Sequence, residues 1–68
     1  MNQVDARGRS CPEPVIMTQK ALKADSKGVE VLVDNVCAVE NITRYATSQG
    51  YSVSNQQSGA EYKLNIQK

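Results

Sequence analysis

Cys11-Pro12-Glu13-Pro14 marks the point at which a short strand gives way to an amphipathic helix. Pro12 disfavours the helical conformation for the residue before it, so Cys11 is expected just outside the helix, with its side chain directed outward. Pro12 and Pro14 fit a first helical turn, where a missing backbone N–H removes no hydrogen bond. The stretch therefore predicts a cysteine at the N-terminus of a helix over residues 12–24.

This position favours ionisation of the Cys11 thiol. The N–H groups of a first helical turn and the positive end of the helix dipole lower the pKa of a nearby thiol. Arg7 and Arg9 act in the same direction, whereas Glu13 opposes them. A thiol with the ordinary pKa of about 8.5 is only a few per cent ionised at neutral pH. We therefore expect Cys11 to be a nucleophile with a lowered pKa.

Five further elements follow from hydrophobic periodicity and turn signals. Before the helix, an alternating segment predicts a strand over residues 3–6, and the loop after it contains Gly8 as a turn glycine. After the helix we expect a strand over 29–34, a helix over 38–49, and strands over 51–56 and 61–67. Residues 57–60 carry a hairpin signal. The predicted order is β-α-β-α-β-β.

One face of every predicted strand is apolar and the other is polar, with Leu32 as the large exception. A sheet covered on both faces would be apolar on both, so both helices should cover one face of a four-stranded mixed sheet. The fold class is thus a two-layer α/β sandwich. A right-handed crossover makes the first two strands parallel, which places Cys11 and Cys37 at the same end of the sheet.

Composition excludes several kinds of site. The 68 residues contain no histidine, so a Cys–His catalytic pair and a four-ligand zinc site of Cys and His are both ruled out. The glycines are too far apart for a phosphate-binding loop, so no cofactor or metal is expected. A net charge of +1 and only three tyrosines argue against nucleic acid as a partner.

Length and hydropathy set the remaining limits. Sixty-eight residues allow one domain, residues 1–68, with a small core and no deep cleft, which argues against a stand-alone enzyme for a small molecule. The longest apolar run is far too short for a membrane span, and no leader is evident. We expect a cytoplasmic protein whose cysteines are reduced.

The residues resemble a known family. The segments 4–8 and 11–15 resemble the N-terminal signature of the TusA/SirA-like sulfur carriers, and segments 33–35, 40–44 and 48–51 look most like the carrier domain of YedF-type proteins, which are associated with selenium metabolism. The resemblance covers essentially the whole chain. It implies that Cys11 carries sulfur as a persulfide, received from a cysteine desulfurase and passed to a downstream protein such as a DsrE-like acceptor.

Other side chains around the motif have two interpretations each. Pro12, Glu13, Pro14 and Gly8 shape the turn, and Asp5 is expected to accept a turn hydrogen bond. Arg7 and Arg9 are either solvated loop charges or contacts for an acidic partner. A helical wheel places Ile16 among Gln19, Lys20 and Lys23 on the exposed face, where it could anchor a partner.

Two alternatives to a sulfur carrier stay open. One is a thiol redox or peroxide-sensing module that uses Cys11 and Cys37, and the other is a noncatalytic regulatory or RNA-binding domain, because a similar sandwich occurs in a translation initiation factor. Cys37 itself is either a small buried residue at the second helix start or a second thiol that attacks a Cys11 persulfide.

Overall fold

The computed structural model describes residues 2–10 and 13–68. Its elements follow the predicted order, and their bounds are β1 (Asn2–Asp5), α1 (Glu13–Ala24), β2 (Gly28–Val33), α2 (Val36–Ser48), β3 (Ser52–Ser58) and β4 (Glu61–Gln67). The four strands form one sheet in the order β1-β2-β4-β3. β1 and β2 are parallel and the other neighbours are antiparallel, so the predicted mixed sheet is confirmed.

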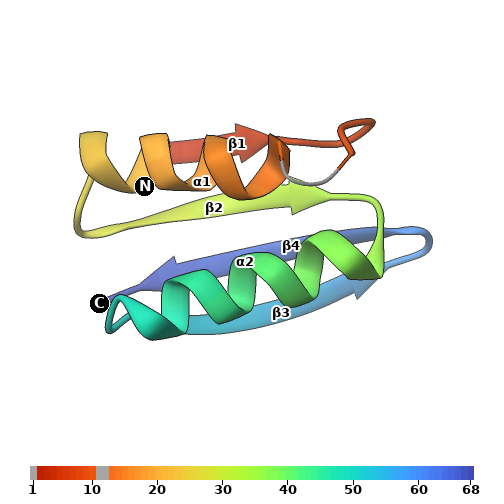
Figure 1. Cartoon of the computed structure of the whole chain (residues 1–68). Helices are drawn as coiled ribbons and strands as arrows, with labels where there is room; N and C mark the ends of the chain where they lie inside the picture. Colours follow the sequence, from red (N-terminus) through yellow and green to blue (C-terminus); the bar gives the residue numbers. More distant parts are fainter. Residues whose placement is uncertain (1, 11–12) are drawn as a thin grey trace.

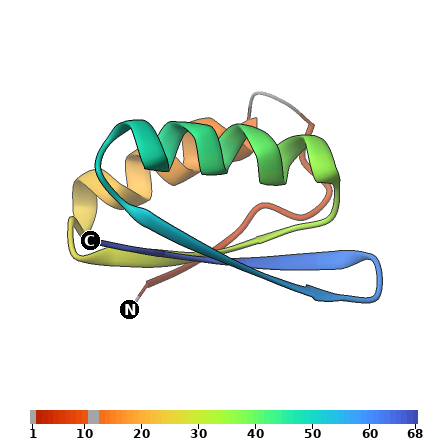
Figure 2. The same cartoon turned by 90° about the horizontal axis from the view of Figure 1, so that it is seen from below.

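Both helices lie on one face of this sheet, as the sidedness of the strands predicted. Figure 1 shows α1 beside β1 and β2, and α2 beside β4 and β3. In the turned view of Figure 2 the two helices form one layer and the four strands form the other. The face of the sheet opposite the helices, here called the open face, carries the polar members of the alternating strands.

The core lies between the two layers. Thr18 is the one buried polar residue among the described residues, and its hydroxyl donates a 2.8 Å hydrogen bond to the Pro14 carbonyl. Central strand β2 contributes every second side chain, and α2 contributes residues at helical spacing. The buried apolar residues are Ala6, Leu22, Val29, Val31, Val33, Ala38, Ile42, Ala46, Leu64 and Ile66.

Several predicted details differ from the structure. Strands β1 and β2 each begin and end one residue earlier than predicted. Helix α2 begins at Val36, two residues early, because Asn35 caps it: its backbone is extended and its Oδ1 accepts a 2.7 Å hydrogen bond from the Ala38 N–H. Strand β3 continues to Ser58, because its polar end still pairs with β4, and only residues 59–60 form the turn. The helical wheel that predicts an exposed Ile16 also places Ala24 on the core face of α1, but Ala24 is exposed because α1 ends there.

Candidate functional site

The loop between β1 and α1 is held against the loop that follows β2. Gly8 has φ +77°, a backbone conformation that favours glycine, and its N–H donates a 2.8 Å hydrogen bond to Oδ2 of Asp34. Asp34 directly follows β2, and β1 and β2 are parallel neighbours, so both loops leave the same end of the sheet (Figure 1). The predicted turn role of Gly8 is confirmed, with Asp34 as an additional partner.

Arg7 joins the same loop to the hairpin between β3 and β4. Its Nε and Nη2 donate to the two carboxylate oxygens of Asp5 at 2.9 and 2.8 Å, and its Nη1 lies 3.2 Å from Oε2 of Glu61. The Arg7 backbone N–H also donates to Asp5 at 3.1 Å, which confirms the turn hydrogen bond predicted for Asp5. These bonds lower the pKa of Asp5 to about 2 and raise that of Arg7.

Helix α1 begins at Glu13, two positions after the predicted nucleophile Cys11. The Glu13 N–H donates to the Ser10 carbonyl at 2.9 Å, and Arg9 Nη1 lies 3.4 Å from Oε2 of Glu13. These two contacts link the end of the loop, at residues 9–10, to the first residue of α1. The predictions for Cys11 and Pro12 concern residues outside the described part of the chain. Pro14 lies in the first turn of α1, as predicted, and it is buried there.

The predicted charge balance around Cys11 was incomplete. Arg7 is bound to Asp5 and Glu61, and Arg9 is paired with Glu13. A further carboxylate, that of Asp34, holds the Gly8 N–H. The two arginines therefore do not outnumber the nearby acidic groups. The expectation of a lowered Cys11 pKa now rests on the N-terminus of α1, whose first-turn amides stabilise a nearby anion.

Cys37 lies in the first turn of α2, at the same end of the sheet as the β1–α1 loop. Its side chain is exposed, and the Asn41 Nδ2 group donates a 3.5 Å hydrogen bond to its sulfur. The alternative of a buried, structural Cys37 is therefore wrong. The reason is helical spacing, because Ala38, Ile42 and Ala46 form the core face of α2 and Cys37 lies about 100° around the helix from Ala38.

The outer face of α1 matches the helical-wheel prediction. Ile16 is 43% exposed, and Lys20 and Lys23 are exposed as well, whereas Thr18 and Leu22 are buried. Because Ile16 is the fourth residue of α1, it lies one turn from the helix start that follows Cys11. An exposed apolar side chain with lysines on the same face is thus placed close to the loop.

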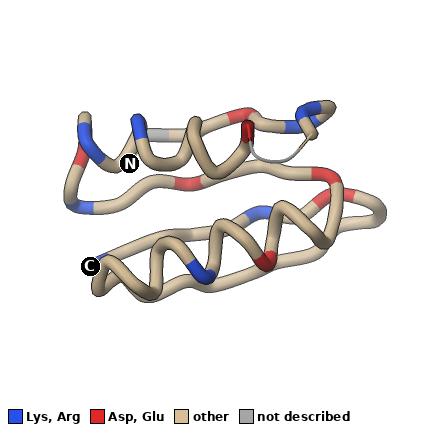
Figure 3. The backbone as a smooth tube through the Cα atoms, viewed as in Figure 1, with Lys and Arg blue, Asp and Glu red and all other residues tan. Residues whose placement is uncertain are grey.

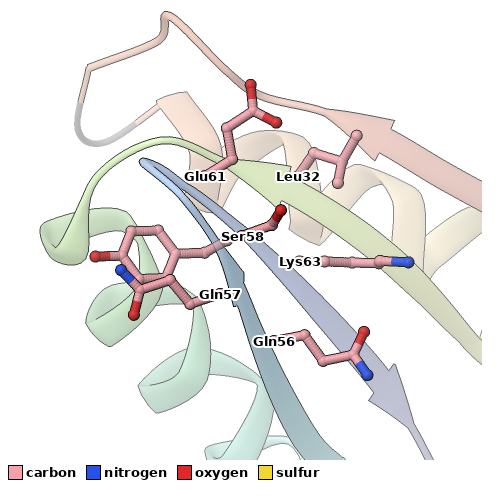
Figure 4. A pocket seen from close by; sticks show the side chains of 7 residues that line it. Leu32, Gln56, Gln57, Ser58, Glu61 and Lys63 are labelled. Atoms are coloured by element: carbon pink, nitrogen blue, oxygen red, sulfur yellow. The ribbon is translucent and has the colours of Figure 1, made fainter.

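A separate depression lies at the hairpin end of the sheet. Figure 4 shows Leu32, Lys63 and Gln56 on the neighbouring strands β2, β4 and β3, and register confirms that Lys63 is opposite both of the others. Leu32, the exception in the predicted polar face, is half-buried in this row. The depression is lined by Leu32, Gln56, Gln57, Ser58, Glu61, Tyr62 and Lys63.

Sequence reasoning missed the two carboxylates that hold the loop, Asp34 and Glu61. The position of Asp34 in the sequence could have indicated its contact with the first loop, because Asp34 lies at the end of a strand that was predicted to end beside that loop. Nothing in the sequence indicated the contact of Glu61, since 54 residues separate it from Arg7.

Among residues 2–10 and 13–68 no group of three or more potential metal ligands is assembled. Within the same residues, no helix is long and apolar enough to cross a membrane.

Comparisons with known proteins agree with this geometry. Residues 2–68 match the family model described as sulfurtransferase TusA. A protein of Methanocaldococcus jannaschii, provisionally described as a sulfur carrier, is 44% identical over 55 residues, which are 78% of this chain and 73% of that protein.

The fold is also found in a solved structure. The crystal structure of a SirA-like protein from Desulfitobacterium hafniense has a TM-score of 0.89 and 34% sequence identity, and the match covers 98% of this chain and 96% of that one. The family is identified by a family model that matches nearly the whole chain and by a solved structure that shares its fold over nearly the full length of both chains. The chain belongs to the TusA/SirA-like family of sulfur carriers.

Proposed function

We propose that this protein carries sulfur as a persulfide on Cys11. In the loading step the Cys11 thiolate attacks the outer sulfur of a donor persulfide, forming Cys11–S–SH and releasing the donor cysteine as a thiolate. In the discharge step an acceptor thiolate attacks the outer sulfur of Cys11–S–SH and restores the Cys11 thiolate. Both steps balance without an oxidant or reductant.

The observation that carries this proposal is the place of Cys11 in the chain. It stands between Ser10, the last described residue of an exposed loop, and the helix that begins at Glu13. A carrier thiol must be reached by two different proteins and must be ionised, but it needs no base held beside it. The absence of histidine is compatible with that chemistry, since the partner proteins supply the activated groups.

Membership of the sulfur-carrier family supports a proposal for the partners. The donor is a cysteine desulfurase, which forms a persulfide on its own cysteine, and the acceptor is a further relay protein with a reactive thiol, such as a DsrE-like protein. Cytoplasmic conditions keep the Cys11 thiol reduced for the exchange. The resemblance to YedF-type carrier domains extends the proposal to selenium metabolism, with selenium as an alternative cargo.

Mass spectrometry of the intact protein tests the loading step. After incubation with a cysteine desulfurase and cysteine, the wild type should gain the mass of one sulfur atom, and alkylation mapping should place it on Cys11. Cys11→Ser should gain nothing, while the matched variant Cys37→Ser should still load. Equal loading of Cys11→Ser and the wild type would refute the carrier function.

The exposure of Cys37 favours a second candidate role, in which it resolves the persulfide. The Cys37 thiolate would attack the inner sulfur of Cys11–S–SH, form a Cys11–Cys37 disulfide and release hydrosulfide. This would make the protein a thiol redox module as well as a carrier. Such a protein should lose two hydrogens and one sulfur on standing, and Cys37→Ala should lengthen the persulfide lifetime. An unchanged lifetime would eliminate the resolving role.

A further inference from the structure

Strand β3 is an unprotected edge of the sheet. It lies at one end of the order β1-β2-β4-β3, so one side of its backbone has no strand partner within residues 2–10 and 13–68. It is seven residues long and pairs with β4 one-to-one along its whole length, without a bulge. Sheet edges are usually protected by short length, charged side chains, proline or a bulge. β3 has none of these features.

The opposite edge, β1, is shorter than β3 and carries a charged residue. It has four residues, and it ends at Asp5, whose carboxylate is bound to Arg7. Figure 3 shows charged positions near the end of β1 and none along β3. The residues of β3 are Ser52, Val53, Ser54, Asn55, Gln56, Gln57 and Ser58, and all but Val53 are exposed. Only β3 therefore offers a long, neutral strand for pairing.

We infer that β3 pairs antiparallel with β3 of a second copy of this chain, so that two sheets join into one of eight strands. A two-fold axis at Asn55 aligns all seven residues, and any other register aligns fewer. It sets Asn55 opposite its own copy, Ser54 opposite Gln56, Val53 opposite Gln57 and Ser52 opposite Ser58. Each amide or hydroxyl then meets a neutral group, and no like charges are brought together.

A second copy is the occupant that this strand fits best. A strand without charge offers a charged peptide no electrostatic complement, whereas amides and hydroxyls both donate and accept hydrogen bonds with their own kind. One shared strand pair falls within the class of small interfaces below about 1,200 Å², so the dimer should be weak and concentration-dependent. The β1–α1 loop lies toward the far edge of the sheet, so pairing through β3 leaves it accessible.

Sedimentation equilibrium of the full chain tests this inference. The wild type should shift from its 7.4 kDa monomer toward twice that mass as its concentration rises. Asn55→Lys should weaken the dimer by up to about tenfold, because two lysines face each other at the axis. The matched control Asn65→Lys adds the same charge on β4, inside the sheet, and should leave the dimer unchanged.

Mixing Asn55→Lys with Asn55→Glu tests the register. The two variants should form a mixed dimer more readily than either forms its own. A wild type that stays monomeric at every concentration, an Asn55→Lys variant that dimerises normally, or a mixture that shows no preference would each overturn the inference. Circular dichroism confirms folding, since Asn55 is exposed, and sulfur loading of Cys11 is measured separately, so that either proposal can fail alone.

Discussion

At the scale of single residues, the carboxylate of Asp34 connects two loops that are far apart in the sequence. Its bond to the Gly8 N–H joins the loop that leads to Cys11 to the loop that leads to Cys37. For Arg7 and Arg9 the sequence left two interpretations open, solvated loop charges or contacts for an acidic partner, and the structure adds a local role. Arg7 and Arg9 each form an ion pair with a carboxylate of this chain, and these ion pairs hold the loop. A partner that binds either arginine would have to compete with its ion pair.

Replacement of Asp34 by alanine should impair the site more than the fold. Loss of the charged acceptor leaves the Gly8 N–H without its partner and should cost roughly 1 kcal/mol of stability. We expect faster hydrogen exchange at the Gly8 amide and slower sulfur loading of Cys11. The free energy of unfolding from a urea titration and the initial loading rate from mass spectrometry measure the two effects.

Asp25→Ala is the matched control for this change. Its carboxylate accepts a comparable backbone bond, from the Lys27 N–H at 3.1 Å, but it lies before β2, at the opposite end of the sheet. It should lose similar stability and load sulfur at the wild-type rate. If Asp25→Ala slows loading as much as Asp34→Ala does, the Asp34 effect is one of general stability and not of loop position.

At the scale of elements, α1 combines a core face with an exposed face that is suited to docking. Thr18 and Leu22 attach the helix to the sheet, while Ile16 and Lys20 point to solvent. A docking site beside the nucleophile needs apolar contact for affinity and charge for association rate and specificity. Ile16 would supply the apolar contact, and Lys20 would supply the charge that attracts a partner with an acidic rim.

Ile16→Ser should therefore raise the KM for sulfur transfer from the desulfurase, by several-fold to about tenfold if it is an anchor. The melting temperature should change little, because Ile16 is already 43% exposed. Steady-state transfer kinetics and thermal unfolding measure the two quantities. A large loss of stability with unchanged transfer would assign Ile16 to the core and would remove it from the docking surface.

Lys20→Glu should slow association with an acidic-rimmed partner, and added salt should reduce the difference from the wild type. Lys27→Glu makes the same charge change beyond the end of α1, in the turn before β2. It serves as the control and should leave transfer unaffected. Equal effects of the two variants would show that net charge, and not this face of α1, governs docking.

At the scale of the whole molecule, the element order and the two-layer architecture were predictable from the sequence. Alternation along strands and helical spacing of apolar residues report which face is buried, and Ala38, Ile42 and Ala46 all follow that pattern. Boundaries were less predictable, because pairing with β4 extends β3 through polar residues that resemble a turn. Asn35 did carry a capping signal for the earlier start of α2.

The site was only partly predictable for a different reason. The residues that follow Cys11 in sequence have local signals, since proline and helix position act within one turn. The groups that hold the loop come from Asp34 and Glu61, which lie 26 and 54 residues from their partners. Such contacts depend on strand order and register, which local patterns do not specify. The ion pair between Arg7 and Glu61 was missed for that reason.

The most direct test of the carrier function follows a single sulfur atom through discharge. Protein loaded with isotopically labelled sulfur on Cys11 is separated from the desulfurase and mixed with a reduced relay protein, and both chains are weighed by mass spectrometry over time. We predict that the label leaves Cys11 and appears on a cysteine of the acceptor in equal amount, with no free sulfide released. Label that stays on Cys11, or that is recovered only as free sulfide, would contradict a carrier role.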